Sequence, residues 1–444
     1  MKIRSKSFLF YCIIFLTLTL NFKMNIAGSA NAGFFNNFQF DTESMVVGRL
    51  IYSERYGLFS HAGFLGWIEP VPAGKNYFWY QYEAYQDPKD FDTYKAYYSQ
   101  PALQAFIYGV LCRITGLNGY SALDFFKWLV SMFNALIFVV FIKWIQRRWG
   151  WATALFTLLT VCFSQWITVF GRNIFWVLGA FYLPFVAALW YLQKYEQSVK
   201  HPLRAAFWLM FSAMLLKCLL TGFEYITTTV VMSVTPWFFY MVINEWNWKI
   251  FLKNISVASA GVLAAVVTAM AGLALQLSFV MGSIGEGFQY IISSFGRRTY
   301  GNVGTFDSSY QESINSNLWD VLSAYWNRNA FDISHWFDFP LWKMFSHISF
   351  GNCILLFAVV TYIVYSSNTI RQFPVFRKQQ LALITMLWVS LLAPLSWFVI
   401  FKAHSYVHTH MNHIVWHLPF MLLGATLTGS TLWFLIRRKK GIMN

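Results

Sequence analysis

The sequence predicts an all-α, polytopic membrane protein with about ten transmembrane helices. Hydrophobic residues make up 57% of its 444 positions and charged residues only 11%, whereas soluble domains are about 45–50% apolar and about 25% charged. The apolar residues come in runs of the length that crosses a hydrocarbon core of about 30 Å, which is about 20 residues. Trp and Tyr often lie near the ends of these runs, as interfacial anchors do. We therefore expect one membrane domain over residues 1–444 and no separate soluble domain.

Basic residues predict the orientation of these helices. The N-terminus reads MKIRSK, the C-terminus reads RRKKGIMN, and the short connections carry pairs such as Arg147 and Arg148 or Arg377 and Lys378. An even number of spans puts all of these segments on one side, which is cytoplasmic by the positive-inside rule. The ten runs lie at about 7–24, 121–143, 151–169, 174–193, 205–222, 226–243, 254–280, 349–366, 380–400 and 413–435.

The first run has an alternative interpretation. Its basic start, short apolar stretch and the sequence AGSANA resemble a secretory signal peptide. Cleavage after Ala32 would leave nine helices. The polar stretch from Asn21 to Ala32 contains Lys23 and is long for a cleavage region, which favours a retained helix.

Charge and cysteines exclude other classes of protein. The net charge of +15 does not gather on one basic face, so nucleic acid is not an expected partner. The five cysteines are far apart in the sequence and show neither a metal-binding spacing nor a disulfide framework. The sequence also lacks the phosphate loop GxxxxGK, GxGxxG, HExxH and GxSxG, which gives no support to ATP-driven transport or to the common hydrolase designs.

Two long outer loops are predicted, at residues 25–120 and 281–348. The first loop contains FDTESMVVGRLIYSERYG, in which Met45, Val46, Leu50 and Ile51 fall on one helical face. It also contains a helical segment beginning near Pro101, and the second loop has similar segments at about 284–295 and 317–326. We expect these to be helices lying at the outer membrane interface. Most of the 18 acidic residues fall on this side, since only Glu196 and Glu245 lie in predicted cytoplasmic connections.

Two carboxylates follow the first helix directly. Asp41 and Glu43 open the first outer loop, and Asp41 stands where an N-cap would be for the helix that follows. A carboxylate held at the membrane surface can also act as a general base. Capping and catalysis are compatible roles for Asp41.

The order of these features resembles the GT-C superfamily of membrane glycosyltransferases, including the protein O-mannosyltransferase-like and aminoarabinose-transferase-like proteins of bacteria. DTESMVVGRLIYSERYG is similar to the acidic first-loop motif of that superfamily, and SQPALQAFIYGVL is similar to its second interfacial helix. FGRNIFWVLGAFYLPFVAALWYL resembles its outer turn and fourth helix. The resemblance covers roughly the first 200 residues, and many members have two adjacent acids where this chain has Asp41 and Glu43 separated by Thr42.

The resemblance implies a function and a location. The chain would be an inverting glycosyltransferase in the bacterial inner membrane, with its active site facing the periplasm or exterior. The donor would be a sugar on a polyprenyl phosphate, and the acceptor would be a lipid, glycan or protein. Asp41 or Glu43 would take the proton from the acceptor hydroxyl as it attacks the anomeric carbon. The departing phosphate would need cations or hydrogen-bond donors.

Candidate phosphate ligands gather in KAHSYVHTHMNHIVWH, between the ninth and tenth runs. Five of the nine histidines of the chain lie here, and Lys402, His404, His408 and His410 head the segment. Cations at this depth suit a phosphate. The spacing also permits a divalent cation held by the pairs His404/His408 or His413/His417, so metal dependence stays open. A third interpretation is interfacial residues with polar tips and no special role.

Other basic residues are weaker candidates. Arg172, in the outer turn FGRN, is a further phosphate ligand or an interfacial anchor. Arg297 and Arg298 form a Gly-flanked pair in the second outer loop. Lys217 lies inside an apolar run and is followed by Glu224; an intramembrane charge indicates a functional site by default, and snorkelling towards the outer surface is its alternative.

Two competing functions follow from the same features. A lipid or oligosaccharide transporter or flippase usually has charges near the midplane, repeats and broken helices, but here most charges lie in outer loops. An oligosaccharide polymerase or ligase also uses outer loops rich in Arg and His. The acid directly after the first helix favours the transferase.

Overall fold

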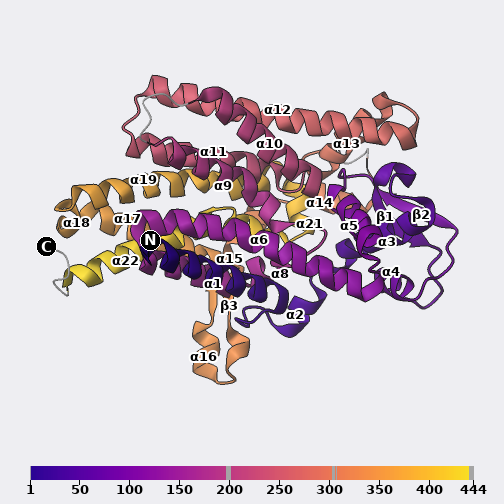
Figure 1. Ribbon diagram of the computed structural model, residues 1–444, viewed down its shortest axis with the longest axis horizontal. Coiled ribbons are helices and arrows are strands. Elements are labelled where there is room, and N and C mark those ends of the chain that lie inside the picture. Colours follow the sequence, from indigo (N-terminus) through magenta and orange to yellow (C-terminus); the bar gives the residue numbers. More distant parts are fainter. Residues whose placement is uncertain (1, 197–201, 303–305, 307, 440–444) are drawn as a thin grey trace.

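The computed structural model describes residues 2–196, 202–302, 306 and 308–439, without the side chains of 2–7, 308 and 309. The basic N-terminal segment MKIRSK and residues 440–444 of the basic C-terminal segment therefore lie outside the described side chains. The chain is mostly helical, with long helices running side by side along the longest axis (Figure 1).

The bundle is formed by helices from the whole length of the chain. The first part contributes α1 (Lys2–Met24), α6 (Gly119–Trp149), α7 (Trp151–Phe163), α8 (Gln165–Gly171), α9 (Leu178–Lys194), α10 (Leu203–Thr221), α11 (Ile226–Ile243) and α12 (Trp248–Met281). The last part contributes α17 (Phe350–Ser366), α18 (Asn368–Arg371), α19 (Pro374–Ser390), α20 (Leu392–Ile400) and α22 (Phe420–Lys439).

The chain is a multi-pass membrane protein, but ten spans is too high a number. Within the described residues, six helices are long and apolar enough to cross a membrane, namely α6, α10, α11, α12, the continuous pair α19–α20, and α22. A seventh span results if α7 and α8, which bend by 72°, count as one. The other three predicted runs form α1, α9 and α17, whose apolar lengths are shorter. These three runs were predicted as spans from their hydropathy, which does not show at which residue a helix begins or is interrupted.

The first helix is packed into the bundle. Leu18 and Phe22 are fully buried, and the Asn21 amide donates to the Cys162 carbonyl at 3.2 Å and to Thr168 Oγ1 at 3.0 Å. Lys23 pairs with Asp124 of α6 at 2.6 Å. These contacts join α1 to α6, α7 and α8.

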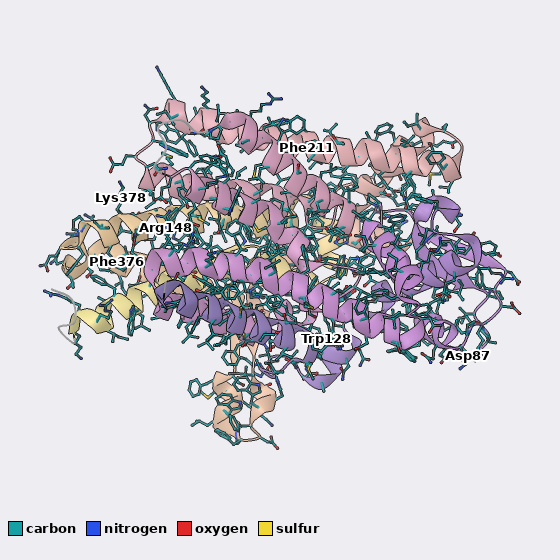
Figure 2. The ribbon with its side chains drawn as sticks, in the orientation of Figure 1. Asp87, Trp128, Arg148, Phe211, Phe376 and Lys378 are labelled. Carbon is teal, nitrogen blue, oxygen red and sulfur yellow. The ribbon has the colours of Figure 1, made fainter. Side chains whose placement is uncertain are left out.

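Two ion pairs lie at one end of the bundle. Arg148 and Lys378 lie at the end where α1 begins and α22 ends, whereas Asp87 lies at the opposite end (Figure 2). Both acids predicted on the cytoplasmic side are neutralised there, because Glu196 pairs with Arg148 and Glu245 pairs with Lys378.

The first outer loop forms a compact layer at the end opposite the termini (Figure 1). The predicted helix is α3 (Phe40–Tyr56), and all four residues of its predicted apolar face are buried. Gly48 lets α3 approach the sheet so closely that a Cβ there would collide with the Gly66 carbonyl. The other elements are α2 (Ala32–Asn37), η1 (Ser60–Gly63), β1 (Leu65–Glu69), α4 (Tyr77–Gln86), β2 (Thr93–Tyr97) and α5 (Leu103–Thr115), with β1 and β2 antiparallel.

Two local predictions in this loop need correction. Asp41 is not the N-cap of α3, because the helix begins at Phe40 and its N-cap is Gln39 in a left-handed conformation. Asp41 instead lies in the first turn, where a carboxylate still interacts favourably with the helix dipole. The short antiparallel sheets were also not expected of an all-α protein, since neither pair of strands has a long alternating pattern.

The second outer loop contains the two predicted helices, as α13 (Ile284–Arg298) and α15 (Leu318–Asn327). It also contains α14 (Ser308–Asn315) and an arm that projects sideways from the bundle (Figure 1). The arm consists of β3 (Asn329–Asp332), η3 (Ser334–Trp336), α16 (Pro340–Phe345) and β4 (His347–Ser349). The histidine-rich segment follows α20 and forms α21 (Lys402–Val407) and η4 (Asn412–His417).

Candidate functional site

A pocket of about 240 Å³, whose lining combines apolar side chains with two arginines and a glutamate, lies where both outer loops meet the histidine-rich segment. We call it the arginine pocket. It is bordered by α3, β2, the turn before α9, the turn before α11, α13, α14 and α21. Its lining residues are Thr42, Met45, Tyr97, Phe175, Trp176, Glu224, Arg297, Arg298, Tyr310, Ser313, Ala403, His404, Val407, His408 and Met411.

Two adjacent arginines at the C-terminal end of α13 give the pocket its positive charge. Arg298 donates to the Tyr97 hydroxyl at 3.3 Å and lies 3.8 Å from Glu224 Oε1. Arg297 stacks on Tyr310, at 4.9 Å from the ring centroid, and pairs with no acid among the described residues. One guanidinium is thus held in place by protein groups, and the other is available to an anion.

A buried lysine fixes the turn that carries Glu224. Lys217 is fully buried, and its ammonium donates to the carbonyls of Gly222 at 2.9 Å and Glu224 at 2.6 Å. The turn needs this support because Gly222 and Tyr225 both have positive φ angles. Lys217 therefore does not snorkel to the surface, and its described contacts are those of a residue that positions Glu224.

Burial disfavours the charged form of the two histidines that line the pocket. Burial lowers the pKa of His404 well below its usual range, and the charges of Arg298 and His410 add to this effect. Burial also lowers the pKa of His408 to about 3. Burial therefore disfavours the charged form of both histidines, and in its neutral form each can still donate one N–H hydrogen bond to a phosphate.

Several polar atoms around the pocket have no hydrogen-bond partner among the described residues, although Glu224 Oε2 lies 3.8 Å from His404 Nε2. They include the indole N–H of Trp176, Oε2 of Glu224 and Nδ1 of His408, all of which are buried. Buried polar groups are normally hydrogen-bonded, and leaving one unpaired costs about 1–3 kcal/mol. Such a group of unpaired atoms around a cavity indicates a polar ligand.

An apolar pocket of about 390 Å³ adjoins the arginine pocket and shares Arg298 with it. Its walls come from α11, α12, α13 and Phe401, and Val266, Met270 and Leu273 belong to the long membrane-spanning helix α12. The full set is Tyr98, Ser99, Phe223, Ile226, Val266, Met270, Leu273, Tyr290, Ile291, Ile292, Ser294, Phe295, Arg298 and Phe401. A polar head site and an apolar chain site thus meet at one guanidinium.

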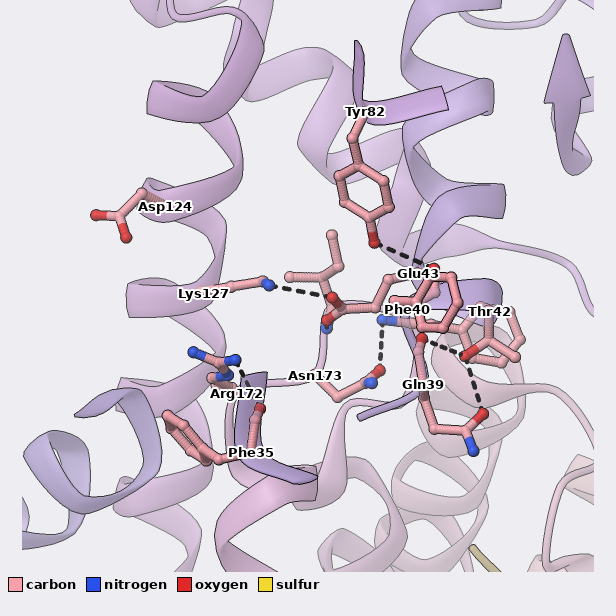
Figure 3. Close-up of polar contacts among 12 residues, drawn as sticks. Phe35, Gln39, Phe40, Thr42, Glu43, Tyr82, Asp124, Lys127, Arg172 and Asn173 are labelled. Atoms are coloured by element: carbon pink, nitrogen blue, oxygen red, sulfur yellow. Dashed lines mark hydrogen bonds and ion pairs between the residues drawn. The ribbon is translucent and has the colours of Figure 1, made fainter. Parts of the chain in front are cut away.

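Glu43 is occupied by protein groups. It is 4% exposed, accepts a hydrogen bond from the Ile174 backbone N–H at 2.9 Å, and pairs with Lys127 of α6 at 3.1 Å. Figure 3 shows the Lys127 ammonium directed at this carboxylate. Glu43 thereby joins α3 to α6 and to the turn before α9, which are contacts of a structural residue.

Asp41 differs from Glu43 in having no side-chain partner. Its carboxylate makes no hydrogen bond or ion pair with any described residue, and the side chain is half-buried. It follows Phe40 at the start of α3 and precedes Thr42, which lines the arginine pocket. Its negative charge also reaches His410, where it opposes the lowering of the pKa by burial. Of the two predicted acids, Asp41 is the one free to accept a proton.

Arg172 and Lys402 do not line the arginine pocket. Arg172 donates to the Phe35 carbonyl at 2.7 Å and stacks on the Phe35 ring at 4.0 Å (Figure 3). Lys402 donates to the carbonyls of Ile314 at 2.8 Å and Ser316 at 2.7 Å, which fastens α21 to the second outer loop. Both cations are bound by backbone carbonyls, and His410 is also absent from the lining.

The described residues do not form a metal site. No group of three or more His, Cys, Asp or Glu side chains among them could hold an ion. His413 stacks between Trp166, at 4.8 Å, and Tyr325, at 4.5 Å, and His417 lies 3.1 Å from the Ser164 hydroxyl. The pair His413/His417 is therefore integrated into the packing of η4.

Sequence reasoning missed Tyr97 and Trp176 as pocket residues. Both are aromatic residues in a chain whose aromatic content is 20%, so nothing in their local sequence distinguishes them. No significant similarity links the chain to a protein-family model, a curated protein or a solved structure.

Proposed function

We propose that the chain is a membrane glycosyltransferase that moves a sugar from a polyprenyl-phosphate donor to an acceptor at the outer face of a bacterial inner membrane. The observation that carries the proposal is the junction of two pockets at Arg298. A ligand that fills both must have a polar, anionic head and a long apolar chain. A sugar linked through phosphate to a polyprenyl chain has this chemistry.

The charges around the head pocket suit the leaving group. Arg297 and Arg298 would contact the phosphate, and the neutral histidines would donate hydrogen bonds to its oxygens. The apolar pocket beside α12 would hold the first part of the polyprenyl chain, and the rest of that chain would extend into the bilayer. Glu224 would keep Arg298 oriented, because its carboxylate and the Tyr97 hydroxyl both contact that guanidinium.

Asp41 would act as the general base. It would take the proton of the acceptor hydroxyl as that oxygen attacks the anomeric carbon from the side opposite the phosphate. The bond between the anomeric carbon and the phosphate oxygen would break, and its electron pair would stay on the phosphate. A single displacement of this kind inverts the anomeric configuration.

The proposal is tested by transfer assays with the purified full-length protein in lipid vesicles. A panel of radiolabelled polyprenyl-phosphate sugars and membrane acceptors is supplied to wild type, Asp41→Ala and Asp90→Ala. Asp90 is a matched control, because it is an exposed acid of the same loop. Thermal melting confirms that the variants are folded.

We expect release of polyprenyl phosphate by wild type and Asp90→Ala, and a loss of at least about a hundredfold in Asp41→Ala, since general bases contribute about 10²–10⁴-fold. Full turnover in Asp41→Ala would exclude Asp41 as the base. Equal binding of the lipid by all three proteins without any turnover would favour a transporter or flippase instead.

A further inference from the structure

A second polar pocket, of about 460 Å³, lies on another part of the molecule, between α2, the start of α8 and the loop from α15 to β3. It shares no lining residue with the arginine pocket. Its volume falls within the range of about 300–1,000 Å³ that is typical of ligand sites. Its polar lining consists of Asn31, Gln165, Asn327, Arg328, Asn329 and Asp332, and we call it the amide pocket.

The chemistry of this lining is dominated by planar groups. Three asparagines and one glutamine supply amides, which both donate and accept, and Arg328 and Asp332 add a guanidinium and a carboxylate. The two charges cancel, so the pocket as a whole favours a neutral ligand. The arginine pocket, in contrast, contains two arginines and one glutamate.

Internal hydrogen bonds hold several of these side chains in position. Asn31 Oδ1 accepts a hydrogen bond from the Phe34 backbone N–H at 2.9 Å, and the Asn329 side-chain amide lies 2.9 Å from His347 Nδ1. The backbone carbonyl of Asn329 accepts from the Trp166 indole N–H at 2.9 Å. Asp332 Oδ1 accepts from the Ser334 hydroxyl at 2.7 Å. The site is therefore built before a ligand arrives, which reduces the entropy cost of binding.

Two residues have polar groups that no described residue satisfies. Gln165 is only 8% exposed, lines the pocket, and its side-chain amide makes no hydrogen bond within the described structure. Arg328 has no ion pair or side-chain hydrogen bond among the described residues, although its charge reaches His413 and lowers the pKa of that residue. A side-chain amide that lines a cavity without a protein partner can complete its hydrogen bonds with a ligand.

An apolar surface completes the pocket. Phe34 and Trp166 line it beside the amides, and their rings meet edge to face at 5.6 Å. Hydroxyl groups around the edge of a pyranose ring match planar amides, and its C–H face matches an aromatic ring. A lipid chain would leave the amides unpaired, and an anion would face Asp332.

We propose that the amide pocket binds a neutral saccharide. If the chain is the transferase proposed above, this is the site that would hold an acceptor glycan, and that further assignment depends on the proposed function. Binding itself does not, because it follows from the lining of the pocket alone.

The test measures saccharide binding by saturation-transfer NMR on the full-length protein in lipid nanodiscs. The probes are the methyl glycosides of glucose, galactose, mannose and N-acetylglucosamine and their common disaccharides. Four proteins are compared: wild type, Gln165→Leu, Arg328→Ala and Arg297→Ala. Arg297→Ala is the matched control, because it removes an arginine that lacks an acidic partner from the other pocket.

We expect at least one probe to bind wild type and Arg297→Ala equally, and to bind Gln165→Leu and Arg328→Ala about tenfold more weakly, since a hydrogen bond of ordinary strength changes affinity by about that factor. Arg328 is exposed and makes no side-chain hydrogen bond or ion pair with the described residues, so its variant reports binding even if Gln165→Leu is unstable. Absence of binding by every probe would overturn the proposal, as would binding that is lost only in Arg297→Ala.

The transfer assay keeps the two proposals apart. Saccharide binding without any transfer would support the amide pocket and contradict the proposed function. Transfer that depends on Asp41, without saccharide binding in the amide pocket, would support the proposed function and contradict the proposal for the amide pocket.

Discussion

Two groups of polar residues around the outer loops are used differently by the protein. In the first group, Glu43 is buried against Lys127 and the Ile174 N–H, and nearby Arg172 is bound by the Phe35 carbonyl. In the second group, Asp41 has no side-chain partner among the described residues, and Arg297 of the arginine pocket has only an aromatic neighbour. The charges of the first group all have protein partners, and we call it the saturated network. The second group has charges and hydrogen-bond donors without such partners near a cavity.

This comparison separates structure from function more clearly than residue type does. Both groups contain an acid and an arginine that the sequence singled out. What distinguishes them is whether the folded protein already satisfies each charge, because a charge without a protein partner is available to a ligand. The predictions below test that distinction, beginning with the largest expected effect.

Breaking the saturated network should destabilise the protein. In Glu43→Ala, the Lys127 ammonium and the Ile174 N–H lose their acceptor, and loss of one partner of a largely buried pair costs about 3–5 kcal/mol. We expect a clear fall in the melting temperature in detergent or nanodiscs. The double variant Glu43→Gln/Lys127→Met should recover part of this loss, and an unchanged melting temperature in Glu43→Ala would contradict a structural role.

Removing Arg297, the arginine without an acidic partner among the described residues, should affect activity rather than stability. Arg297→Ala loses only the contact with Tyr310 within the described structure, so its melting temperature should change little. If Arg297 stabilises the departing phosphate, turnover should fall by about a hundredfold, which corresponds to about 2.7 kcal/mol. Arg113→Ala, in the first outer loop, serves as a control. A large loss of stability with normal turnover of the folded fraction would reverse the assignment.

The histidines of η4 should make the protein sensitive to acid. Burial, and then the charge of Arg328, lower the pKa of His413 to about 3, below its ordinary value of about 6.5. The unfolded chain therefore binds more protons than the folded one below pH 6.5, and stability is lost as the pH falls through this value. The loss is at most about 1.4 kcal/mol per pH unit for one histidine.

The variant His413→Phe isolates this effect, because phenylalanine keeps a planar ring between Trp166 and Tyr325 without a titrating group. We expect its melting temperature to fall less than that of wild type between pH 7 and pH 5. An identical pH dependence in the two proteins would show that His413 does not contribute to acid sensitivity.

The smallest effect is expected at the opposite end of the bundle. Lys378 and Glu245 form an exposed pair at 2.5 Å, and exposed pairs of this kind contribute little because solvent screens them. Lys378→Ala should leave both the melting temperature and turnover at wild-type values. A marked fall in stability would mean that charge at this end is not simply screened by solvent.

The membrane class and the positions of most helices could be predicted from the sequence, because apolar runs and helical periodicity are local signals. The segments around 40–56, 284–295 and 317–326 all form helices near the predicted places. The number of spans was overestimated, because the runs that form α1, α9 and α17 give helices with short apolar lengths, and the bend between α7 and α8 depends on packing. The arm at 329–349 was missed for a similar reason, since its strands are only three and four residues long.

The candidate site was predictable only in part. Asp41, His404 and His408 were identified from their position and residue type, and they lie in or beside the arginine pocket. Lys402 and Arg172 had equally suggestive positions but contact carbonyls of other elements, which no local pattern reveals. Arg298, Glu224 and Tyr97 come from three segments that meet only in the folded chain. The neutrality of the histidines also depends on burial, which a sequence does not display.

The position of Arg298 on the wall of both the arginine pocket and the apolar pocket constrains how this protein can diverge. A replacement at this position alters two surfaces at once, so selectivity for the head of a ligand cannot change there independently of selectivity for its chain. Neighbouring positions that contact only one surface, such as Thr42 or Met270, allow the two preferences to vary separately. Substitutions combined with a change at Arg298 should be non-additive, and new specificities would arise first around this arginine rather than at it.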